Sequence, residues 1–359
     1  MPEGVSVFCN CGEVAMIMNE LFSVPEVVAC AARLSSVSAI SHSNDTDHHI
    51  LSFLKKNVAS LMACPSSAEA ISAGAAMLSA GKRVLVVTKE PDIIAVKNTA
   101  QSRLPLLIFA ASYPEDIMAL RDTGAIIVFC FSNQELFDTI VQFFRICEDG
   151  KVLLPCIIVW DGPVSYSEPF VVVSDQMIKN FLPQLRLPQK LDVKRPSFLG
   201  IDETKDFRQQ EFKIMESVSK NMSVFDDNWK RKFKRPLPAY EKYMCDDAEF
   251  VLVTYGYHSN TAKAAVDTLR AQGKKAGLLR IRVFRPFPAA SASEISQKKV
   301  AVLDFAVSPG SGSPLYQEIK TAAKFCISFI SFQKYLSEKD FLEIFSRLEK
   351  SEKEEVFWL

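Results

Sequence analysis

Four short, almost uninterrupted apolar segments constrain the fold of this chain more than any other feature of its sequence. They read KRVLVVT (82–88), LPLLIFAA (104–111), GAIIVFCFS (124–132) and VLLPCIIVW (152–160). A strand that is apolar on both sides belongs to a sheet whose two faces are both covered, which is typical of parallel sheets. The four segments therefore predict buried strands of one parallel sheet.

The stretches between these strands have the spacing of helices. In NQELFDTIVQFFRIC (133–147) the apolar residues recur at helical spacing, and Ser132 with Glu135 forms a capping-box signature at its start. The stretch AEAISAGAAMLSAG (68–81) predicts a second helix, made of small residues. This alternation of strands and helices indicates that residues 1–162 form an α/β domain.

The remaining residues divide into a connector and a second domain. Residues 163–244 contain repeated prolines and a charged helical stretch at 206–233, which is typical of a connector that crosses domain surfaces. From residue 245 strands and helices alternate again, so we expect a second α/β domain at 245–359. Its predicted strands are 249–256, 275–284 and 298–307. Its last predicted element is an amphipathic helix at 337–350, with Ser337 as N-cap.

The charge balance argues against a nucleic-acid-binding protein. Among 359 residues, 42 Lys and Arg meet 42 Asp and Glu, so the chain lacks the basic footprint of such a protein. The basic run WKRKFKRP (229–236) is the best contrary hint, and we prefer to interpret it as a solvated helix end. No apolar run approaches the roughly 18 residues of a membrane helix, and no secretory signal is visible. We expect a cytoplasmic protein without a membrane or nucleic-acid partner.

Cysteines and histidines do not form a recognisable metal site. The nine cysteines are scattered, and no C-x-x-C occurs, so reduced thiols without zinc or an iron–sulfur cluster are the simplest interpretation. The pair Cys9 and Cys11 has no second ligand pair. His48 and His49 follow two aspartates, but we favour a polar loop over a metal role. The turn SPGSGSP (308–314) resembles a phosphate-cradling loop, for which a structural role is preferred over anion binding.

Six sequence blocks occur together in the order known from one enzyme family. They are MALRDTG (118–124), VLLPCIIVWDG (152–162), FLP (181–183), DAEFVLVTYG (247–256), LRIRVFRPFP (279–288) and AVLDFAVSPGSGSPLYQEIK (301–320). Together they resemble the α subunit of 2-oxoacid:ferredoxin oxidoreductases, pyruvate:ferredoxin oxidoreductase above all. The resemblance is specific from about residue 118 to 320 and weak before residue 65.

The resemblance implies a fold and a role within a larger assembly. The first domain would resemble the domain that holds the pyrimidine of thiamine diphosphate, and the second the transketolase C-terminal domain. A β-type subunit would hold the diphosphate and Mg²⁺, and other subunits would carry iron–sulfur clusters and coenzyme A contacts. The implied reaction is oxidative decarboxylation of a 2-oxoacid, with pyruvate expected, to acyl-CoA and CO₂. Electrons would pass to ferredoxin, and the isolated chain would be inactive.

Several departures from the family concern its reactive site. The glutamate that contacts N1′ of the pyrimidine falls on Ser67, whose hydroxyl cannot replace a carboxylate in a charge-assisted bond. Ser66 and Glu69 form a capping box, which favours a helix start here, and Glu69 could substitute only if the backbone shifted. The substrate threonine falls near Leu34. The insertion that carries the substrate arginine is shortened, and a family turn is replaced by residues 89–92.

Two interpretations of these losses remain open. Either the chain is a contributing α-type subunit, slow on ordinary 2-oxoacids unless another subunit supplies the missing groups, or it is a catalytically silent paralogue that acts as a structural or regulatory partner. Arg121, Asp122 and Arg285 lie in the best-matching blocks. They are candidates for the interface between the two domains or with a partner subunit.

Overall fold

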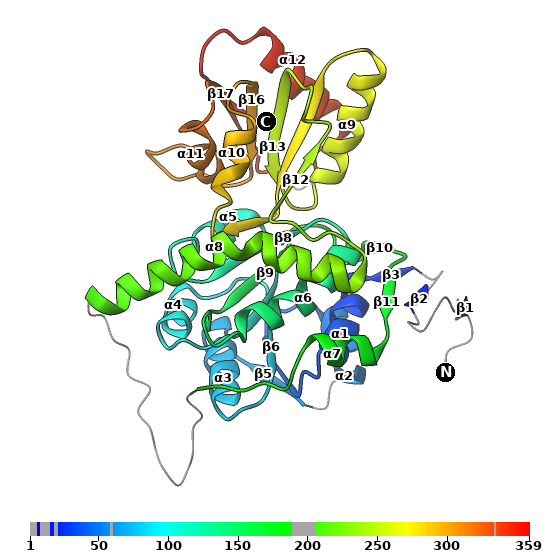
Figure 1. The fold of residues 1–359 in the computed structure, drawn as a ribbon, viewed down its shortest axis with the longest axis vertical. Coiled ribbons are helices and arrows are strands. Elements are labelled where there is room, and N and C mark those ends of the chain that lie inside the picture. Colours follow the sequence, from blue (N-terminus) through cyan, green and yellow to red (C-terminus); the bar gives the residue numbers. More distant parts are fainter. Residues whose placement is uncertain (1–5, 8–14, 18–20, 58–59, 189–204, 334) are drawn as a thin grey trace.

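The computed structural model describes residues 6–7, 15–17, 21–57, 60–188, 205–333 and 335–359. Two α/β units, each built on its own sheet, are stacked on one another (Figure 1). The lower unit in that view comes mainly from the first two thirds of the chain, helix α8 (Lys205–Phe233) included, and the upper unit from the last third. This arrangement places one edge of the first sheet against the second unit.

The N-terminal sheet has seven strands in the order β15-β8-β9-β7-β6-β4-β5. Its parallel strands are β4 (Ala39–Ser43), β5 (Leu61–Cys64), β6 (Val84–Thr88), β7 (Leu107–Ala111), β8 (Ile126–Cys130) and β9 (Cys156–Trp160). The four strands predicted from apolar runs are confirmed as β6 to β9, and every residue of β6, β8 and β9 is buried. The continuous apolar pattern therefore did indicate a parallel sheet covered on both faces.

Helices cover both faces of this sheet. They are α1 (Val24–Leu34), α2 (His48–Asn57), α3 (Ser67–Ser79), α4 (Ile93–Gln101), α5 (Pro114–Met118) and α6 (Asn133–Cys147). One hydrophobic core contains residues of α3, α4 and α5, and another contains residues of α1, α2 and α6. Helix α6 has the predicted bounds, and the N–H of Glu135 donates to Ser132 Oγ at 3.2 Å, which confirms the expected cap.

The C-terminal sheet has six strands in the order β12-β14-β13-β16-β17-β18. They are β12 (Tyr240–Tyr243), β13 (Phe250–Tyr255), β14 (Ala276–Ile281), β16 (Lys299–Asp304), β17 (Phe325–Ile330) and β18 (Val356–Trp358). All neighbours are parallel except β12 and β14. The accompanying helices are α9 (Ser259–Ala271), α10 (Ala289–Glu294), α11 (Pro314–Lys320) and α12 (Glu338–Lys350), and Ser337 caps α12 as predicted.

One predicted strand is shared between the two sheets. The sequence predicts a single strand over 275–284, whereas the structure divides it into β14 and β15 (Val283–Arg285) with Arg282 between them. Strand β15 pairs antiparallel with β8 at the edge of the N-terminal sheet. An apolar run indicates burial but not which sheet buries it, so the division could not be predicted.

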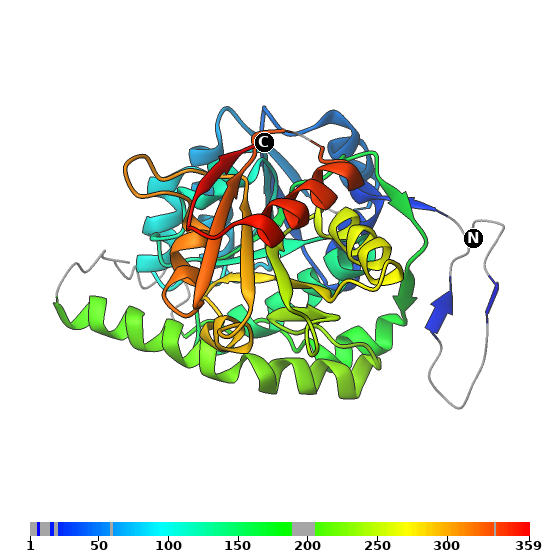
Figure 2. The same ribbon diagram turned by 90° about the horizontal axis from the view of Figure 1, so that it is seen from above.

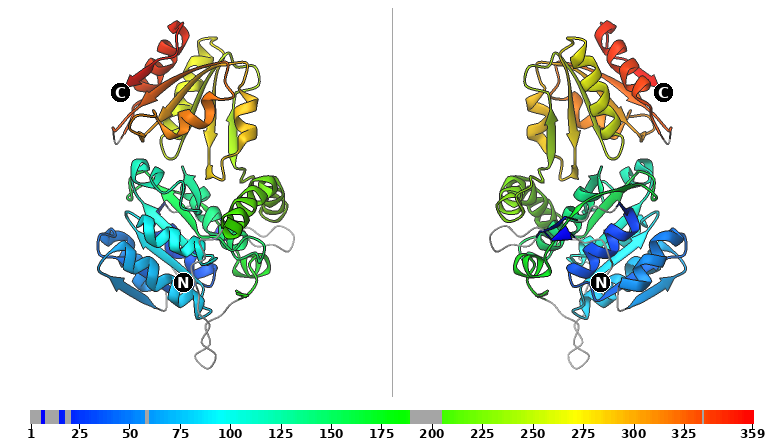
Figure 3. Two further views of the ribbon diagram at one scale, coloured as in Figure 1. Left: turned by 90° about the vertical axis from the view of Figure 1, so that its left-hand side faces the viewer. Right: turned by 90° about the vertical axis from the view of Figure 1, so that its right-hand side faces the viewer.

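The segment between the two units wraps the N-terminal unit. Its elements are β10 (Ser167–Glu168), β11 (Val171–Val173), α7 (Asp175–Phe181) and the long helix α8 (Lys205–Phe233). Strand β10 pairs with the short strand β3 (Phe22–Ser23), and β11 pairs with β2 (Ala15–Ile17). Strand β2 also pairs with β1 (Ser6–Val7). Helix α8 runs along one side of the molecule (Figures 2 and 3). The fully buried Trp229 anchors its end, with Phe181 packed edge-on at a centroid distance of 5.3 Å.

The division of the chain at residues 162 and 244 stays a prediction, to which the sheets add two details. Strand β12 lies inside the predicted connector yet pairs with the second sheet, and β15 lies inside the second predicted domain yet pairs with the first sheet. Within the described ranges, no helix is both long and apolar enough to cross a membrane.

Candidate functional site

A hollow of about 570 Å³ lies at the carboxyl edge of the N-terminal sheet. The loops that follow β4, β6, β7 and β9 line it with polar side chains, among them Thr46, Thr88, Ser112 and Asp161. In open α/β sheets, ligands bind outside the carboxyl ends of the strands. The position and the lining make this hollow the first candidate site of the chain.

Asp161, which directly follows β9, is the most perturbed carboxyl group in the hollow. Its Oδ1 accepts a hydrogen bond from the N–H of Tyr257 in the second unit at 2.7 Å. Its Oδ2 is buried and has no hydrogen-bond partner among the described residues. Burial raises the pKa of Asp161 to about 7, although the bond from Tyr257 opposes this shift. The group therefore changes charge near neutral pH.

Gly256 allows this close contact between the two units. It has φ +70°, a left-handed conformation that glycine adopts without strain, and a side chain there would collide with the carboxylate of Asp161. The carboxyl end of β13 can therefore rest directly on the carboxyl end of β9.

A second hollow of about 230 Å³ continues between the two units. Asp161 and Tyr113 line both hollows. His258 lies in the second hollow and stacks on Phe305 at a centroid distance of 4.4 Å. Burial lowers the pKa of His258 to about 4, so this imidazole is neutral at neutral pH. The carboxyl edges of both sheets thus face one shared space.

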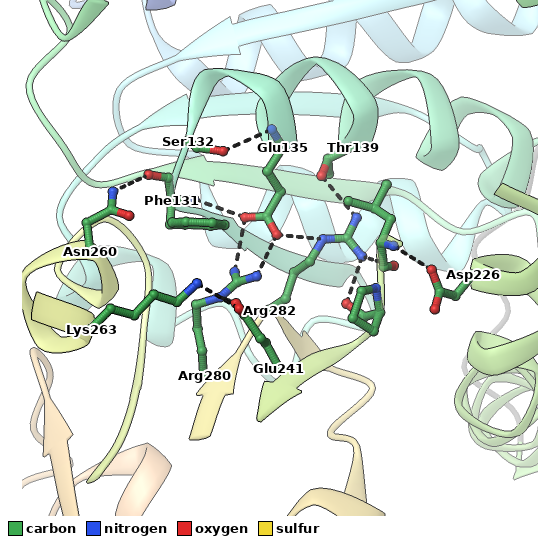
Figure 4. A network of polar contacts seen from close by, with 12 residues as sticks. Phe131, Ser132, Glu135, Thr139, Asp226, Glu241, Asn260, Lys263, Arg280 and Arg282 are labelled. Carbon is green, nitrogen blue, oxygen red and sulfur yellow. Dashed lines mark hydrogen bonds and ion pairs between the residues drawn. The ribbon is translucent and has the colours of Figure 1, made fainter. Parts of the chain in front are cut away.

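Beside the hollows, a buried ionic seam joins the units, which we define as Glu135, Arg280, Arg282, Glu241 and Lys263 (Figure 4). Arg280 donates two hydrogen bonds to the carboxylate of Glu135, at 3.0 and 2.8 Å, and a third to Glu241 at 2.9 Å. The Nε of Arg282 lies 3.6 Å from the same Glu135. The seam ties α6 of the first unit to the second sheet.

Comparison with known proteins now identifies the family. A family model described as "Pyruvate flavodoxin/ferredoxin oxidoreductase, thiamine diP-bdg" matches residues 92–231, and one described as "Pyruvate:ferredoxin oxidoreductase core domain II" matches residues 248–340. Pyruvate synthase subunit PorA of Thermotoga maritima is 33% identical over 281 residues, which cover 72% of each chain. The chain belongs to the 2-oxoacid:ferredoxin oxidoreductase α-subunit family.

Solved structures confirm the fold class of this 2-oxoacid:ferredoxin oxidoreductase α subunit. A 2-oxoglutarate:ferredoxin oxidoreductase from Magnetococcus marinus superposes with a TM-score of 0.69 at 13% identity, over 92% of this chain and 65% of that chain, which is under two thirds of its length. A split-gene transketolase gives a TM-score of 0.51 at 10% identity, over 91% and 98%. The predicted two-domain, thiamine-enzyme-like α/β architecture is thus confirmed.

Ser67 and Glu69, the α subunit's candidates for cofactor contact, lie at the start of α3. Ser66 Oγ accepts the N–H of Glu69 at 3.5 Å and contacts the Glu69 carboxylate, so the predicted cap is confirmed. Ser67 is half-buried, Glu69 is exposed, and neither lines the hollow. A pyrimidine contact needs a carboxylate with a free acceptor atom at this place, and the residues present do not fit that need.

Leu34 lies near the amino end of strand β6, whereas the hollow lies at the carboxyl edge of the sheet. It is the last residue of α1, its side chain is 4% exposed, and the next residue, Ser35, accepts a bond from Arg83 at the amino end of β6. A substrate-facing position near Leu34 does not agree with this placement. A strand that leads into a proline-containing helix start, the pattern expected near Leu34, occurs at residues 22–25.

Arg121 and Arg285 lie between the two units. Arg121 donates to Ser308 Oγ at 3.3 Å, and Arg285 donates to the Arg121 carbonyl at 3.3 Å and pairs with Glu318 at 2.8 Å. Asp122 is mostly exposed and lies 3.7 Å from Arg121. Contact of any of these residues with a partner subunit stays a prediction.

The other candidate metal ligands are partly outside the described ranges. Cys9 and Cys11 lie outside the described residues. His48 and His49 begin helix α2, so the expectation of a polar loop at these two residues is wrong, and His49 lines the hollow. In the part of the chain that the structure describes, no three His, Cys, Asp or Glu side chains are grouped so that they could hold a metal ion.

Sequence reasoning missed Asp161 and the ionic seam. Asp161 reads as an ordinary strand end in VWDG, and its burial depends on Tyr257, 96 residues away in the chain. A usable signal was present in the run LLRIRVF, where two arginines on consecutive inward positions of a buried strand need an acid partner. Glu135 is that partner.

Proposed function

We propose that this chain is the α-type subunit of a cytoplasmic hetero-oligomer that oxidises a 2-oxoacid, with pyruvate as first choice. The products would be an acyl-CoA and CO₂, and ferredoxin would accept the electrons. Membership of the pyruvate synthase family over both units is the observation that carries this proposal. A β-type subunit would share thiamine diphosphate and hold Mg²⁺, and an iron–sulfur subunit would pass the electrons.

We propose further that the usual pyrimidine carboxylate does not come from this chain. Thiamine diphosphate, when bound to the assembly, would supply the electron sink for decarboxylation. Ser67 offers a hydroxyl at the expected position, and the carboxylate of Glu69 is exposed and held by its own helix cap. Our proposal therefore assigns to this chain the supporting walls of the site, through the hollow at the carboxyl edge, and not its acid–base group.

A second candidate function follows from the seam and from the residue at the pyrimidine position. An intact seam between the units combined with a substituted pyrimidine position suits a silent paralogue, kept for assembly or regulation. The two proposals differ in whether turnover needs this chain once the complex is assembled.

Reconstitution separates the two proposals. The chain would be combined with its β-type and iron–sulfur subunits, and pyruvate-dependent ferredoxin reduction would be followed with and without it. Unchanged activity on omission would overturn the enzyme subunit proposal. Ser67→Glu should raise turnover by about 10²–10⁴-fold if an acid–base group is what the site lacks, and Glu69→Gln is the matched control. No gain in Ser67→Glu, with assembly intact, would favour the silent paralogue.

A further inference from the structure

A groove of about 510 Å³ lies where the ends of α6, α7 and α8 meet on the N-terminal unit. None of its lining residues lines the hollow described above. The lining includes part of the basic run 229–236, which the proposed function does not use. A volume of this size is in the range of small-molecule sites.

The charge of the groove is positive. Arg145, Arg231 and Lys232 line it, against a single acid, Asp149. Basic residues in the last turn of a helix offset the helix dipole, so their presence alone does not indicate a ligand. However, none of the three cations forms an ion pair with a carboxylate within the described ranges, whereas Lys220 on the same helix is paired with Glu216.

The amide side chains of the groove point to an acceptor-rich ligand. The oxygen of Asn180 accepts from Gln176 at 2.9 Å, and the oxygen of Asn228 accepts from Arg231 at 2.8 Å. Each asparagine oxygen therefore has one of its two lone pairs occupied, and the NH₂ group, a donor, remains for a further contact. Together with the cations, the groove presents mainly hydrogen-bond donors.

Gln142 is the independent observation that points to a bound group. Its side chain is 1% exposed, and its oxygen accepts from the buried Arg282 at 3.0 Å. Its Nε2 is buried without a hydrogen-bond partner in the described part of the chain. A buried donor without a partner is costly and uncommon in folded proteins. Because Gln142 lines the groove, an acceptor bound there could satisfy this donor.

We propose that this groove binds a phosphorylated small molecule. The donors come from three helices and so approach from different sides, which suits the tetrahedral oxygens of a phosphoryl group better than a planar carboxylate. Phe181 and Phe225 form an apolar wall beside the donors, against which a ring of the ligand packs. Nucleic acid suits the groove less well, because Arg235 at the end of the basic run is bound to the buried Asp138 at 2.8 and 2.6 Å.

Calorimetric titration of the full chain tests the proposal. Inorganic pyrophosphate is the probe for the anion site, ATP adds a ring, and citrate supplies a carboxylate of similar charge. We expect ATP to bind more tightly than pyrophosphate and pyrophosphate more tightly than citrate, with affinity falling as salt is raised. The double variant R231Q/K232Q should weaken pyrophosphate binding by about tenfold or more, as expected for loss of charge-assisted bonds.

Two further variants keep the test decisive. K213Q/K220Q removes the same charge from α8 away from the groove and should change affinity less than about twofold. Gln142→Glu keeps the acceptor for Arg282 but replaces the free donor with an oxygen, and it should abolish pyrophosphate binding while thermal unfolding shows a folded chain. Equal weakening by both double variants, or unchanged binding in Gln142→Glu, would overturn the proposal. So would tighter binding of single-stranded DNA than of ATP. None of these readouts depends on the proposed enzyme function.

Discussion

The ionic seam and the hollow lie side by side between the same two units, and they differ in how completely their polar groups are paired. In the seam, the carboxylate of Glu135 receives two hydrogen bonds from Arg280 and lies 3.6 Å from Arg282. In the hollow, Asp161 has one partnered oxygen and one that has no partner among the described residues.

This difference shows which contacts hold the molecule together and which are available for chemistry. Buried and half-buried ion pairs join α6 to the second sheet, although the Nε of Arg282, 3.6 Å from Glu135, has no hydrogen bond within the described residues. Removing one partner leaves buried charge less well compensated. An unpartnered buried oxygen, in contrast, marks a position at which proton uptake or a ligand changes the free energy. The seam thus joins the two units of the fold, while the hollow keeps a carboxyl oxygen available for chemistry.

The largest effect on stability is expected from a substitution of Glu135 in the seam. Glu135→Ala leaves the buried Arg282 without a carboxylate and Arg280 with Glu241 alone, so we expect the free energy of unfolding to fall by about 3–5 kcal/mol. Urea unfolding followed by circular dichroism measures the change. Glu343→Ala, in the exposed pair with Arg347, is the control and should cost less than about 1 kcal/mol. A cost at Glu135 no larger than in this control would show that the seam is not a stabilising element.

The hollow should reveal itself through pH. Burial raises the pKa of Asp161 to about 7 from an ordinary 3.8, so the folded chain holds this proton more tightly than the unfolded chain. The free energy of unfolding should therefore decrease as the pH rises from about 4 to about 7 and show no further contribution above that. Asp161→Asn should reduce this decrease by a few kcal/mol, since one pKa unit corresponds to about 1.4 kcal/mol.

Urea unfolding at several pH values between about 4 and 8 provides the measurement for Asp161→Asn. The buried Asp304, whose pKa burial raises to about 6, contributes a decrease of the same sign that remains in the variant. If the free energy of unfolding of Asp161→Asn depended on pH as in the unsubstituted protein, the carboxyl group of Asp161 would not be the group that titrates.

A smaller effect is expected at the start of α3, where a loss of stability can be told apart from a loss of turnover. Ser66→Ala removes the N-cap that accepts the N–H of Glu69, and we expect a loss of about 1 kcal/mol. Asp92→Ala, which removes the corresponding cap of α4, should cost a similar amount. A change in reconstituted turnover without a change in thermal stability in Ser66→Ala would show that this helix start acts on the cofactor after all.

The smallest effect is expected at the rim of the interface between the units. Arg121 is partly exposed, its bond to Ser308 measures 3.3 Å, and its pairing with Asp122 is a surface contact. Arg121→Ala should therefore lower the free energy of unfolding by less than about 1 kcal/mol. Differential scanning fluorimetry would detect a larger loss. Such a loss would show that Arg121, like the seam, is a main stabilising contact between the units.

Much of the fold could be predicted because its signals are local. Ser132 and the apolar periodicity after it fix both ends of α6, and the four apolar runs locate β6 to β9. The split of the predicted strand at Arg282 could not be found, because β14 and β15 are equally apolar and differ only in the sheet that receives them.

The site was less predictable because its groups come from distant parts of the chain. The burial of Asp161 depends on Tyr257 and Gly256, and the buried charge of Arg280 is compensated by Glu135. Ser66 was the exception, because a helix cap involves residues three positions apart. Contacts of this local kind can be read from a sequence, whereas contacts between the two units require the coordinates.

Strand β15 has a consequence for how the protein is made. The N-terminal sheet borrows this strand from a segment that leaves the ribosome about 155 residues after the strand it pairs with, β8. At common translation speeds that interval is on the order of 10–30 s. During this time the edge of β8 is open to mispairing with other chains. Nascent chains should therefore need protection at this edge, and truncation before residue 283 should yield an aggregation-prone first unit.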